Sequence, residues 1–326
     1  MINKKNILVT GGAGYIGSHI VEVLVKKKFN VFIFDNLITG YKKLIHKKAK
    51  FIKGDTKNFK KLSSVIRDNN IFSVIHLAAY LNIKESEKKK NKYYKNNVIG
   101  TINLIKACKN STVKNLIFSS SCSVYGEVNG PVAEKRQLRP KSYYGYTKYK
   151  SEKAIIKYSK ICNYKFAILR YFNVAGASNS GKIGEIQNSH GHLFKNLAIQ
   201  STKNKPIVNI YGKNYNTTDG TCIRDYIHVS DLADIHVKVL ANVSKYRKSL
   251  VLNCGYGKGF SVYQIVRLFV KIRKNAKVNF LRRRPGDVAQ IYANTKKLKK
   301  ILRWKPKFNN IYNILKSAIK WENKIN

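Results

Sequence analysis

Short apolar runs alternate with longer, helix-compatible segments along the first half of the chain. The runs are NILVT, VFIFD, FIKGD, SVIHLAA, NLIFSSS and FAILRYF. This alternation is typical of a parallel sheet with helices on both faces. Between the first two runs, GGAGYIGSHIVEVLVKKKF joins a glycine-rich turn to an apolar-periodic helix, which predicts a βαβ unit. We therefore expect an α/β fold with a Rossmann-type doubly wound parallel sheet.

The pattern loosens after about residue 175. There the polar loop SNSGKIGEIQNSHG is followed by scattered short runs, and the basic turn RRRPGD precedes a helical segment that ends near Trp321. The chain contains no internal repeat and no long linker. We expect a Rossmann domain over residues 1–175, to which segments near 219–252 return, and a smaller C-terminal lobe over residues 176–326.

Length and composition indicate a folded, soluble chain. The 326 residues are 44% hydrophobic, enough to bury a sizeable core. No stretch of 18 apolar residues occurs and the N-terminus shows no signal peptide, so we expect no membrane association. The five cysteines are odd in number and widely spaced, and no CxxC pair suggests a metal site or a disulfide framework. A cytoplasmic location fits best.

The formal charge of +48, from 64 Lys and Arg against 16 Asp and Glu, raises the question of a nucleic-acid partner. Short lysine runs recur along the whole chain instead of forming one tail or stripe. Asn, Ile and Tyr are also abundant, and we interpret this composition as mutational bias in an AT-rich genome. We expect weak, salt-sensitive polyanion binding and no specific nucleic-acid partner.

A dinucleotide site is predicted at the first strand-to-helix turn. Gly11, Gly14 and Gly17 form G-x-x-G-x-x-G, where backbone N–H groups and a helix N-terminus can meet a pyrophosphate. Asp35 closes the next strand, and an acid there hydrogen-bonds the adenosine ribose and repels a 2′-phosphate. The expected cofactor is NAD rather than NADP.

The stretch YYGYTKYKSEK contains three tyrosines with a lysine four residues later, which places each pair on one helix face. The pairs are Tyr144/Lys148, Tyr146/Lys150 and Tyr149/Lys153. The same spacing recurs outside this stretch, and with 21 Tyr in so lysine-rich a chain it is expected by chance. Spacing alone therefore identifies no active site.

From GGAGYIGSH to RWKPKF the chain resembles the extended short-chain dehydrogenase/reductase family, and within it most closely the UDP-glucose 4-epimerases. The motifs SSSCSVYG and YYGYTK carry this resemblance. It implies that Ser121, Tyr144 and Lys148 form the catalytic set. Helix geometry turns Tyr146 about 200° and Tyr149 about 140° away from Tyr144, so the three cannot face one nicotinamide.

The resemblance implies an NAD-dependent isomerase of galactose metabolism that interconverts UDP-glucose and UDP-galactose. Lys148 and the oxidised nicotinamide would favour the phenolate of Tyr144, which then acts as general base on the 4-hydroxyl. Hydride passes from C4 to NAD, the 4-keto sugar rotates, and hydride returns to its other face. Ser121 would bind the reacting oxygen and relay the proton. A homodimer is implied by resemblance only.

Further contacts are implied by the same motifs. The cofactor-binding residues are Gly11, Gly14, Tyr15, Ile16, Gly17, Asp35, Asn36, Asp55, Thr56, Leu77, Ala78, Ala79, Asn96, Tyr144, Lys148 and Phe172. The substrate-binding residues are Ser121, Asn173, His192, Leu193, Arg224, Arg284 and Asp287. Arg is scarce in this chain, so the two arginines point to a need for a planar fork that holds phosphate.

Three positions depart from the family pattern or leave the substrate open. Tyr143 stands where the family commonly has Pro, and Leu81 stands where many members have a Lys near the nicotinamide ribose. Ile291 occupies a position whose size controls access of an N-acetyl group, and it is intermediate in size. Activity on N-acetylated UDP-sugars is therefore left open.

Several alternatives have to be weighed against a 4-epimerase. A 4,6-dehydratase would need an acid pair where this chain has Cys122 and Ser123. An epimerase or decarboxylase acting on UDP-GlcNAc or a UDP-uronate shares the Ser/Tyr/Lys core and stays open. The intact core argues against a non-catalytic NAD-binding protein.

Overall fold

The computed structural model describes residues 5–162, 164–186, 192–243, 249–284 and 286–326. The chain forms two compact units, each built from several segments. The first unit comprises Met1–Val124, Pro140–Arg170 and Ala233–Leu252, and the second comprises Tyr125–Arg139, Tyr171–Leu232 and Asn253–Asn326. The chain thus leaves the first unit before residue 175 and returns to it after residue 232. Which ligand each unit binds stays a prediction.

A seven-stranded sheet forms the centre of the first unit, in the order β11-β7-β5-β4-β1-β2-β3. Its strands are β1 (Asn6–Thr10), β2 (Asn30–Asp35), β3 (Lys50–Lys53), β4 (Ser73–His76), β5 (Asn115–Ser121), β7 (Lys165–Tyr171) and β11 (Leu250–Cys254). The pairs β3·β2, β2·β1, β1·β4 and β4·β5 are parallel. From β1 the chain adds β2 and β3 on one side of the sheet, and then crosses over to add β4, β5 and β7 on the other side of β1. This reversal is the topology of a doubly wound sheet. The expected Rossmann-type fold is confirmed.

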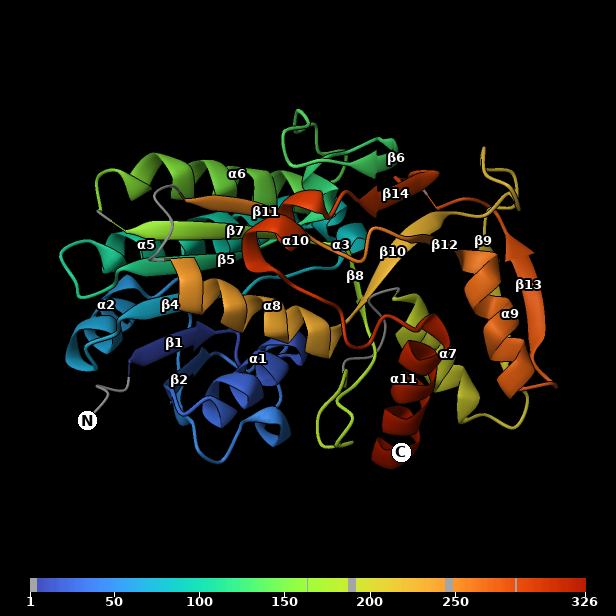
Figure 1. The fold of residues 1–326 in the computed structure, drawn as a ribbon, viewed down its shortest axis with the longest axis horizontal. Helices are drawn as coiled ribbons and strands as arrows, with labels where there is room; N and C mark the ends of the chain where they lie inside the picture. The colour runs from blue at the N-terminus through green and yellow to red at the C-terminus, as the bar shows by residue number, and fades with distance from the viewer. Residues whose placement is uncertain (1–4, 163, 187–191, 244–248, 285) are drawn as a thin grey trace. The chain divides into compact units, whose positions relative to one another are not determined.

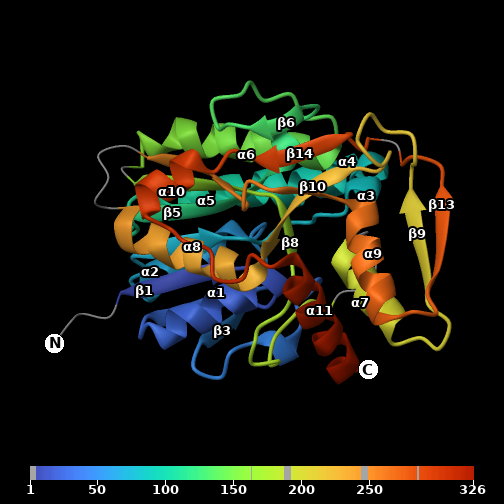
Figure 2. The same ribbon diagram turned by 45° about the vertical axis from the view of Figure 1, so that its right-hand side comes forward.

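Helices cover both faces of this sheet (Figure 1). They are α1 (Tyr15–Lys26), α2 (Phe59–Asp68), α3 (Ile83–Lys88), α4 (Lys90–Tyr93), α5 (Gly100–Cys108), α6 (Tyr143–Ser159) and, from Ala233 onward, α8 (Val229–Asn242). Short 3-10 turns η1 (Lys42–Leu44) and η3 (Cys122–Val124) and a π-helix, η2 (Tyr94–Ile99), complete the unit. Figures 1 and 2 show α1 and α8 in front of the sheet.

The alternation of strand side chains explains why both faces need helices. Leu8 points into a core shared with Leu62 of α2, Leu104 of α5 and Ile155 of α6. Its neighbour in β1, Val9, points to the opposite face and is also fully buried. Strands that are apolar on both sides can be stable only between two helical layers.

Smaller sheets and a helical layer form the second unit. Strands β6 (Asn129–Val132), β8 (Asn173–Ala175), β10 (Ile223–His228), β12 (Gly259–Ser261) and β14 (Gln290–Ala293) make one sheet, and β9 (Ile207–Tyr211) pairs in parallel with β13 (Lys277–Leu281). The helices are α7 (Leu193–Ser201), α9 (Val262–Ile272), α10 (Lys296–Leu302) and α11 (Ile311–Ile325). Figure 2 shows α9 beside β9 and β13. Apolar side chains of α7, α9 and α11 share one core, which contains Leu197, Phe269 and Leu315.

Some features expected from composition can be located directly. Cys108, Cys122, Cys162, Cys222 and Cys254 all carry free thiols. Across the described ranges, no helix combines the length and apolar character that a membrane crossing requires.

Candidate active site

The glycine-rich turn between β1 and α1 is shaped by close backbone approaches. Gly11 has a φ of +74°, and a Cβ there would lie 2.7 Å from the Ala78 nitrogen. A Cβ on Gly17 would lie 2.2 Å from the Gly11 carbonyl oxygen. Gly14 is the N-cap of α1 and no side chain caps the helix there. A side chain at Gly11 or Gly17 would therefore break the turn, and the first turn of α1, with Tyr15 and Ile16, fits a pyrophosphate.

Asp35, at the end of β2, is held by two backbone N–H groups. Its Oδ2 accepts from Ala13 at 3.0 Å, and its Oδ1 accepts from Leu37 at 2.9 Å. Burial raises the pKa of Asp35 above its ordinary value, although these two hydrogen bonds act in the opposite direction. Each oxygen keeps a lone pair for a further donor. The carboxylate is thus positioned to receive ribose hydroxyls.

Three further loops at this edge carry the remaining predicted cofactor residues of the first unit. Asn36 donates to the Asp55 carboxylate at 3.0 Å, and Asp55 also accepts from the backbone of Lys57. Thr56 is buried, and its hydroxyl oxygen would lie 2.6 Å from a Cβ on Gly100. The predicted residues Leu77, Ala78 and Ala79 directly follow β4. These residues fit an adenosine that lies outside the carboxyl ends of the strands.

The π-helix η2 places two asparagines side by side. Asn96, the predicted cofactor residue, is buried and donates to the side-chain oxygen of Asn97 at 3.0 Å. Asn97 was missed from sequence, yet it bonds both backbone groups of Tyr80 and the hydroxyl of Thr147 in α6. The only signal in the sequence for Asn97 was its position next to the predicted Asn96. Asn97 therefore ties the loop after β4 to the helix that carries Tyr144.

Ser121, Tyr144 and Lys148 come together at the end of β5. A side-chain hydrogen bond joins Ser121 to Tyr144. Lys148 is only 3% exposed, donates to the Ser119 carbonyl oxygen at 2.7 Å, and has its nitrogen 6.0 Å from the centroid of the Tyr144 ring. Ser121 also donates to Ser123 at 3.1 Å. The three side chains share one buried corner of the first unit.

Burial dominates the titration of this corner. It raises the pKa of Tyr144 well above the usual value, while the hydrogen bond from Ser121 acts in the opposite direction. It also lowers the pKa of Lys148 to about 7, with the charge of Glu152 opposing the change. Proximity to Lys148 alone therefore does not make Tyr144 acidic. The positive charge of an oxidised nicotinamide would supply the missing stabilisation of the phenolate.

The other two tyrosine-lysine pairs of α6 differ in burial and not in distance. Lys150 lies 5.4 Å from the centroid of the Tyr146 ring, and Lys153 lies 5.7 Å from that of Tyr149. Both of these lysines are exposed to solvent. Water screens an exposed ammonium from its neighbours. Of the three lysines, only Lys148 is buried, where α6 packs against β5.

The start of α6 explains why the absent proline does no damage. Ser142 is the N-cap, and its hydroxyl oxygen accepts from the Gly145 N–H at 3.0 Å. The backbone N–H of Tyr143 donates to Glu87 at 2.7 Å, and that of Tyr144 donates to Ser86 at 3.0 Å. A proline at position 143 would have no N–H to donate. The serine cap and the Glu87 contact position the first turn instead.

Arg224, Arg284 and Asp287 lie in the second unit. Arg224 in β10 approaches the Asp287 carboxylate, with NH2 and Oδ1 3.7 Å apart. The guanidinium of Arg284 lies 3.7 Å from the centroid of the Tyr211 ring, which sequence reasoning did not single out. The Arg284 carbonyl accepts from the Asp287 N–H at 3.3 Å. The two cations and the acid are thus linked in one cluster that suits a diphosphate with an attached sugar.

The remaining predicted residues of the second unit lie on separate elements. Phe172 is buried and its N–H donates to the Cys254 carbonyl, while Asn173 begins β8. Leu193 opens α7, with His192 as its N-cap. His192 Nδ1 lies 2.8 Å from Glu185, and the charge of Glu185 raises the pKa of His192 although burial opposes it.

Two positions relevant to specificity are also placed. Ile291 is buried in β14, opposite Arg224 of β10. Leu81 is exposed in the first unit, and Lys84, in the first turn of α3, is exposed as well. The structure therefore gives Leu81 no polar function of the kind a lysine could serve.

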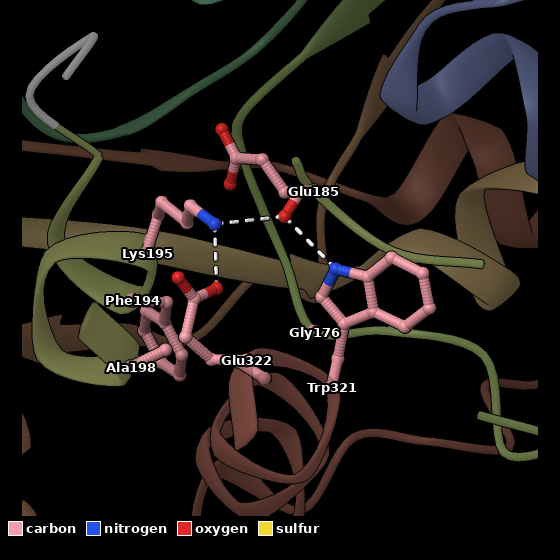
Figure 3. Close-up of a pocket in the computed structure, with 8 residues that line it drawn as sticks. Gly176, Glu185, Phe194, Lys195, Ala198, Trp321 and Glu322 are labelled. Carbon is pink, nitrogen blue, oxygen red and sulfur yellow. Dashed lines mark hydrogen bonds and ion pairs between the residues drawn. The ribbon is translucent and has the colours of Figure 1, made fainter. Parts of the chain in front are cut away.

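Figure 3 shows a buried ion pair in the second unit, beside the Glu185 that also contacts His192. Lys195 of α7 approaches Glu322 of α11 at 2.5 Å and also donates to the Glu185 carbonyl at 3.0 Å. Trp321 donates to the same carbonyl at 2.9 Å. The adjoining cavity of about 10 Å³ is roughly the size of one water. Lys195 and Trp321 therefore hold the Glu185 backbone against α7 and α11.

Comparison with known proteins places this geometry in context. A model of the NAD-dependent epimerase/dehydratase family matches residues 7–255. The chain is 41% identical to a UDP-glucose 4-epimerase of Lactobacillus helveticus, over 97% of this chain and 96% of the relative.

Solved structures of similar proteins cover almost the whole chain. One is a UDP-glucose 4-epimerase of Stenotrophomonas maltophila with bound NAD and formylated UDP-arabinopyranose, at a TM-score of 0.94, 32% identity and 98% coverage of both chains. Another is the UDP-Glc/GlcNAc 4-epimerase of Campylobacter jejuni, at a TM-score of 0.85 and 35% identity, covering 98% of this chain and 99% of the other. Both share the fold described above.

Proposed function

Because the chain belongs to the NAD-dependent epimerase/dehydratase family and uses NAD as its cofactor, we propose that it interconverts UDP-glucose and UDP-galactose. The observation that carries this proposal is that the buried Lys148 and the hydrogen-bonded pair of Ser121 and Tyr144 come together at the end of β5. The names of the similar proteins support UDP-sugars as the substrate class. Intact catalytic groups argue against a non-catalytic NAD-binding protein.

Tyr144 is the proposed general base. Its phenolate takes the proton of the sugar 4-hydroxyl while the hydrogen on C4 leaves as hydride, which produces a 4-keto sugar. NAD accepts that hydride and returns it to the opposite face of the sugar. Tyr144 then gives its proton back to the oxygen at C4. The enzyme and its cofactor end each turnover unchanged.

Lys148 and Ser121 support the base in different ways. The Lys148 ammonium stabilises the phenolate by its charge, which acts strongly because the site is buried. Ser121 already hydrogen-bonds Tyr144, so it is placed to bind the reacting oxygen and pass the proton between the two. The bond from Lys148 to the Ser119 carbonyl sets the direction of the lysine side chain.

Arg224 and Arg284 are the proposed diphosphate ligands in the second unit, and Asp287 the ribose or sugar contact. Stacking on Tyr211 restricts the Arg284 guanidinium before any ligand arrives, which lowers the entropy cost of binding an anion. Asn173, His192 and Leu193 are proposed substrate contacts, and Phe172 a cofactor contact. This assigns NAD to the first unit and the nucleotide sugar mainly to the second.

Ile291 provides the reason for a second candidate substrate. Its side chain is larger than those that admit an N-acetyl group and smaller than the aromatic residues that exclude it. The similar Campylobacter jejuni protein is named for both UDP-Glc and UDP-GlcNAc. UDP-GlcNAc is therefore the alternative to be tested directly, beside UDP-glucuronate.

Incubation of the purified protein with each UDP-sugar tests the proposal. We expect the protein to convert UDP-galactose to UDP-glucose, either with the NAD that it already holds or after NAD is added. Chromatography of the products measures the conversion. Conversion of UDP-GlcNAc at a comparable kcat/KM would make the enzyme bifunctional. The proposal is wrong if none of UDP-galactose, UDP-GlcNAc and UDP-glucuronate is converted.

A homodimer in the cytoplasm is the proposed form of the enzyme. The apolar side chains of Ile99 in η2 and Ile156 in α6 are exposed in the single chain, which supports a partner surface. The five free thiols support a reducing compartment. Light scattering of the purified protein would give twice the chain mass of 37.3 kDa, and a monomeric mass would contradict the proposal.

A further inference from the structure

Glu152 lies one helical turn after Lys148 in α6 and is almost completely buried, with 1% of its surface exposed. Its carboxylate accepts three hydrogen bonds from two residues, which lie on two strands of the sheet. Arg170 of β7 donates from Nε at 3.0 Å and from NH2 at 2.7 Å, and Ser120 of β5 donates to Oε1 at 2.5 Å. No residue of the predicted catalytic set is among these partners.

Lys148 and Glu152 contact successive residues near the end of β5. Lys148 binds the carbonyl of Ser119, Glu152 binds the hydroxyl of Ser120, and the next residue is Ser121. Two side chains of α6 are therefore bonded to consecutive residues of the strand that carries the catalytic serine. Without the Glu152 contact, this part of α6 would be joined to β5, among the described residues, by the Lys148 bond and by the hydrogen bond between Tyr144 and Ser121.

Charge gives Glu152 a second effect on Lys148. Two hydrogen bonds from the Arg170 guanidinium hold the Glu152 carboxylate, and a carboxylate charge favours the ammonium form of a lysine one turn away. Burial brings the pKa of Lys148 down to about 7, and the charge of Glu152 acts against that decrease.

The other titratable groups that face this corner do not replace Glu152. They are His76 of β4, Tyr144 on the same helix, and Tyr93 of α4, which faces Tyr144. Burial lowers the pKa of His76 to about 3, so at neutral pH it is uncharged. Burial raises the pKa of Tyr144 well above its usual value, so without a cofactor its ring is uncharged at neutral pH and gives Lys148 no negative partner.

We propose that Glu152, clamped by Arg170 and Ser120, is a positioning residue that fixes α6 to β5 beside Lys148 and favours the ammonium form of that lysine. The catalytic consequence rests on the function proposed above, whereas the charge state of Lys148 can be measured without turnover. An experiment can therefore contradict the proposed role of Glu152 without contradicting the proposed function, and the reverse.

Titration of Lys148 by NMR is the decisive experiment. In protein labelled with ¹³C at lysine Cε, the Lys148 signal is assigned by its absence from Lys148→Arg. We expect a midpoint near pH 7 in the unaltered protein and a midpoint lower by about one pH unit or more in Glu152→Gln. If the enzyme turns over a UDP-sugar, the alkaline limb of its kcat profile moves down by the same amount, because fewer molecules keep the ammonium at a given pH.

Two further variants separate charge from structure. Glu152→Asp keeps the charge, so its midpoint stays within about half a pH unit of the unaltered protein. The double variant Glu152→Gln/Arg170→Gln removes both charges, so its midpoint lies between those of Glu152→Asp and Glu152→Gln. If Glu152→Gln does not fold, the Lys148 midpoints of Glu152→Asp and of the double variant still test the proposal. The midpoint of the double variant should be the lower one, and equal midpoints contradict the proposal.

A matched control removes a carboxylate elsewhere in the first unit. Glu22 of α1 pairs with the exposed Lys26, so Glu22→Gln should leave the Lys148 midpoint unchanged. An unchanged midpoint in a folded Glu152→Gln variant would overturn the proposal. So would a double variant whose midpoint falls as far as that of the single variant.

Discussion

Lys148 donates a 2.7 Å hydrogen bond from its ammonium group to the carbonyl oxygen of Ser119, in the strand that ends in Ser121. The bond joins α6 to β5 at the point where Tyr144 and Ser121 meet. Because Lys148 is nearly inaccessible to water, its charge acts on Tyr144 with little screening. The same lysine thus both positions the helix and provides the charge that the proposed base requires.

Replacement of Tyr144 by phenylalanine should remove the base and leave the site otherwise intact. We expect kcat on UDP-galactose to fall by about 10²- to 10⁴-fold, with bound NAD and the melting temperature little changed. The matched control is Tyr146→Phe in the same helix, which should keep near-full activity because Lys150 beside it is exposed. A Tyr144→Phe enzyme with more than a tenth of the original kcat would disprove the assignment.

Replacement of Asp35 by asparagine should weaken NAD binding and reduce the discrimination against NADP. An amide removes the negative charge and turns one acceptor toward the N–H of Ala13 or Leu37 into a donor. We expect Kd for NAD to rise about 10-fold, equivalent to about 1.4 kcal/mol. Calorimetry on cofactor-free protein with NAD and with NADP measures both values, and an unaltered ratio between them would argue against a ribose contact.

Replacement of Lys195 by methionine should destabilise the second unit. Glu322 would be left as a buried carboxylate without its cation, a change that costs about 3–5 kcal/mol. Thermal unfolding followed by circular dichroism should show a lower melting temperature. The double variant Lys195→Met/Glu322→Leu removes both charges and should regain most of the loss. If the single and double variants melt together, the ion pair is not the cause.

Acid should destabilise the first unit through His76. This buried ring lies between the hydroxyls of Thr10, at 2.7 Å, and Thr101, at 3.0 Å. Burial first, and the charge of Lys148 second, lower its pKa to about 3 from the ordinary 6.5. The neutral ring therefore stabilises the fold fully above about pH 6.5, and this contribution is lost as pH falls toward about 3, at up to about 1.4 kcal/mol per pH unit.

Melting temperatures at pH 7 and pH 5 measure this effect. We expect the decrease between them to be smaller in His76→Gln than in the unaltered protein, because glutamine has no proton to gain. Asp225 titrates in part of the same range, with its pKa raised to about 6 by burial, and it acts in the opposite direction. Since Asp225 is common to both proteins, the difference between them isolates His76. Equal decreases would contradict the prediction.

Features built from neighbouring residues were predictable from the sequence. The apolar runs became β1, β2, β3, β4, β5 and β7, and the glycine turn between the first two strands confirmed the βαβ unit. Gly11 needs its positive φ because the backbone near Ala78 passes so close to it. Side-chain periodicity and turn chemistry act over a few residues, so the amino-acid order alone contains this information.

Contacts between distant residues were not predictable in the same way. Glu152 pairs with Arg170 across two elements, and Lys195 pairs with Glu322 over 127 positions of chain. In a sequence with 64 basic residues, nothing local distinguishes these two cations from the others. His192 was predicted as a substrate contact, but its partner Glu185, seven residues earlier, was not.

The helix that carries YYGYTKYKSEK separates what the sequence determines from what only the tertiary structure determines. The sequence by itself determined that this segment is a helix and that three of its four tyrosines have a lysine on the same face, since both follow from spacing. Only the tertiary structure decided which lysine is removed from water, because burial depends on how α6 packs against β5. A low dielectric surrounds Lys148 alone among the three, and it is burial that makes Tyr144 the chemically distinct tyrosine.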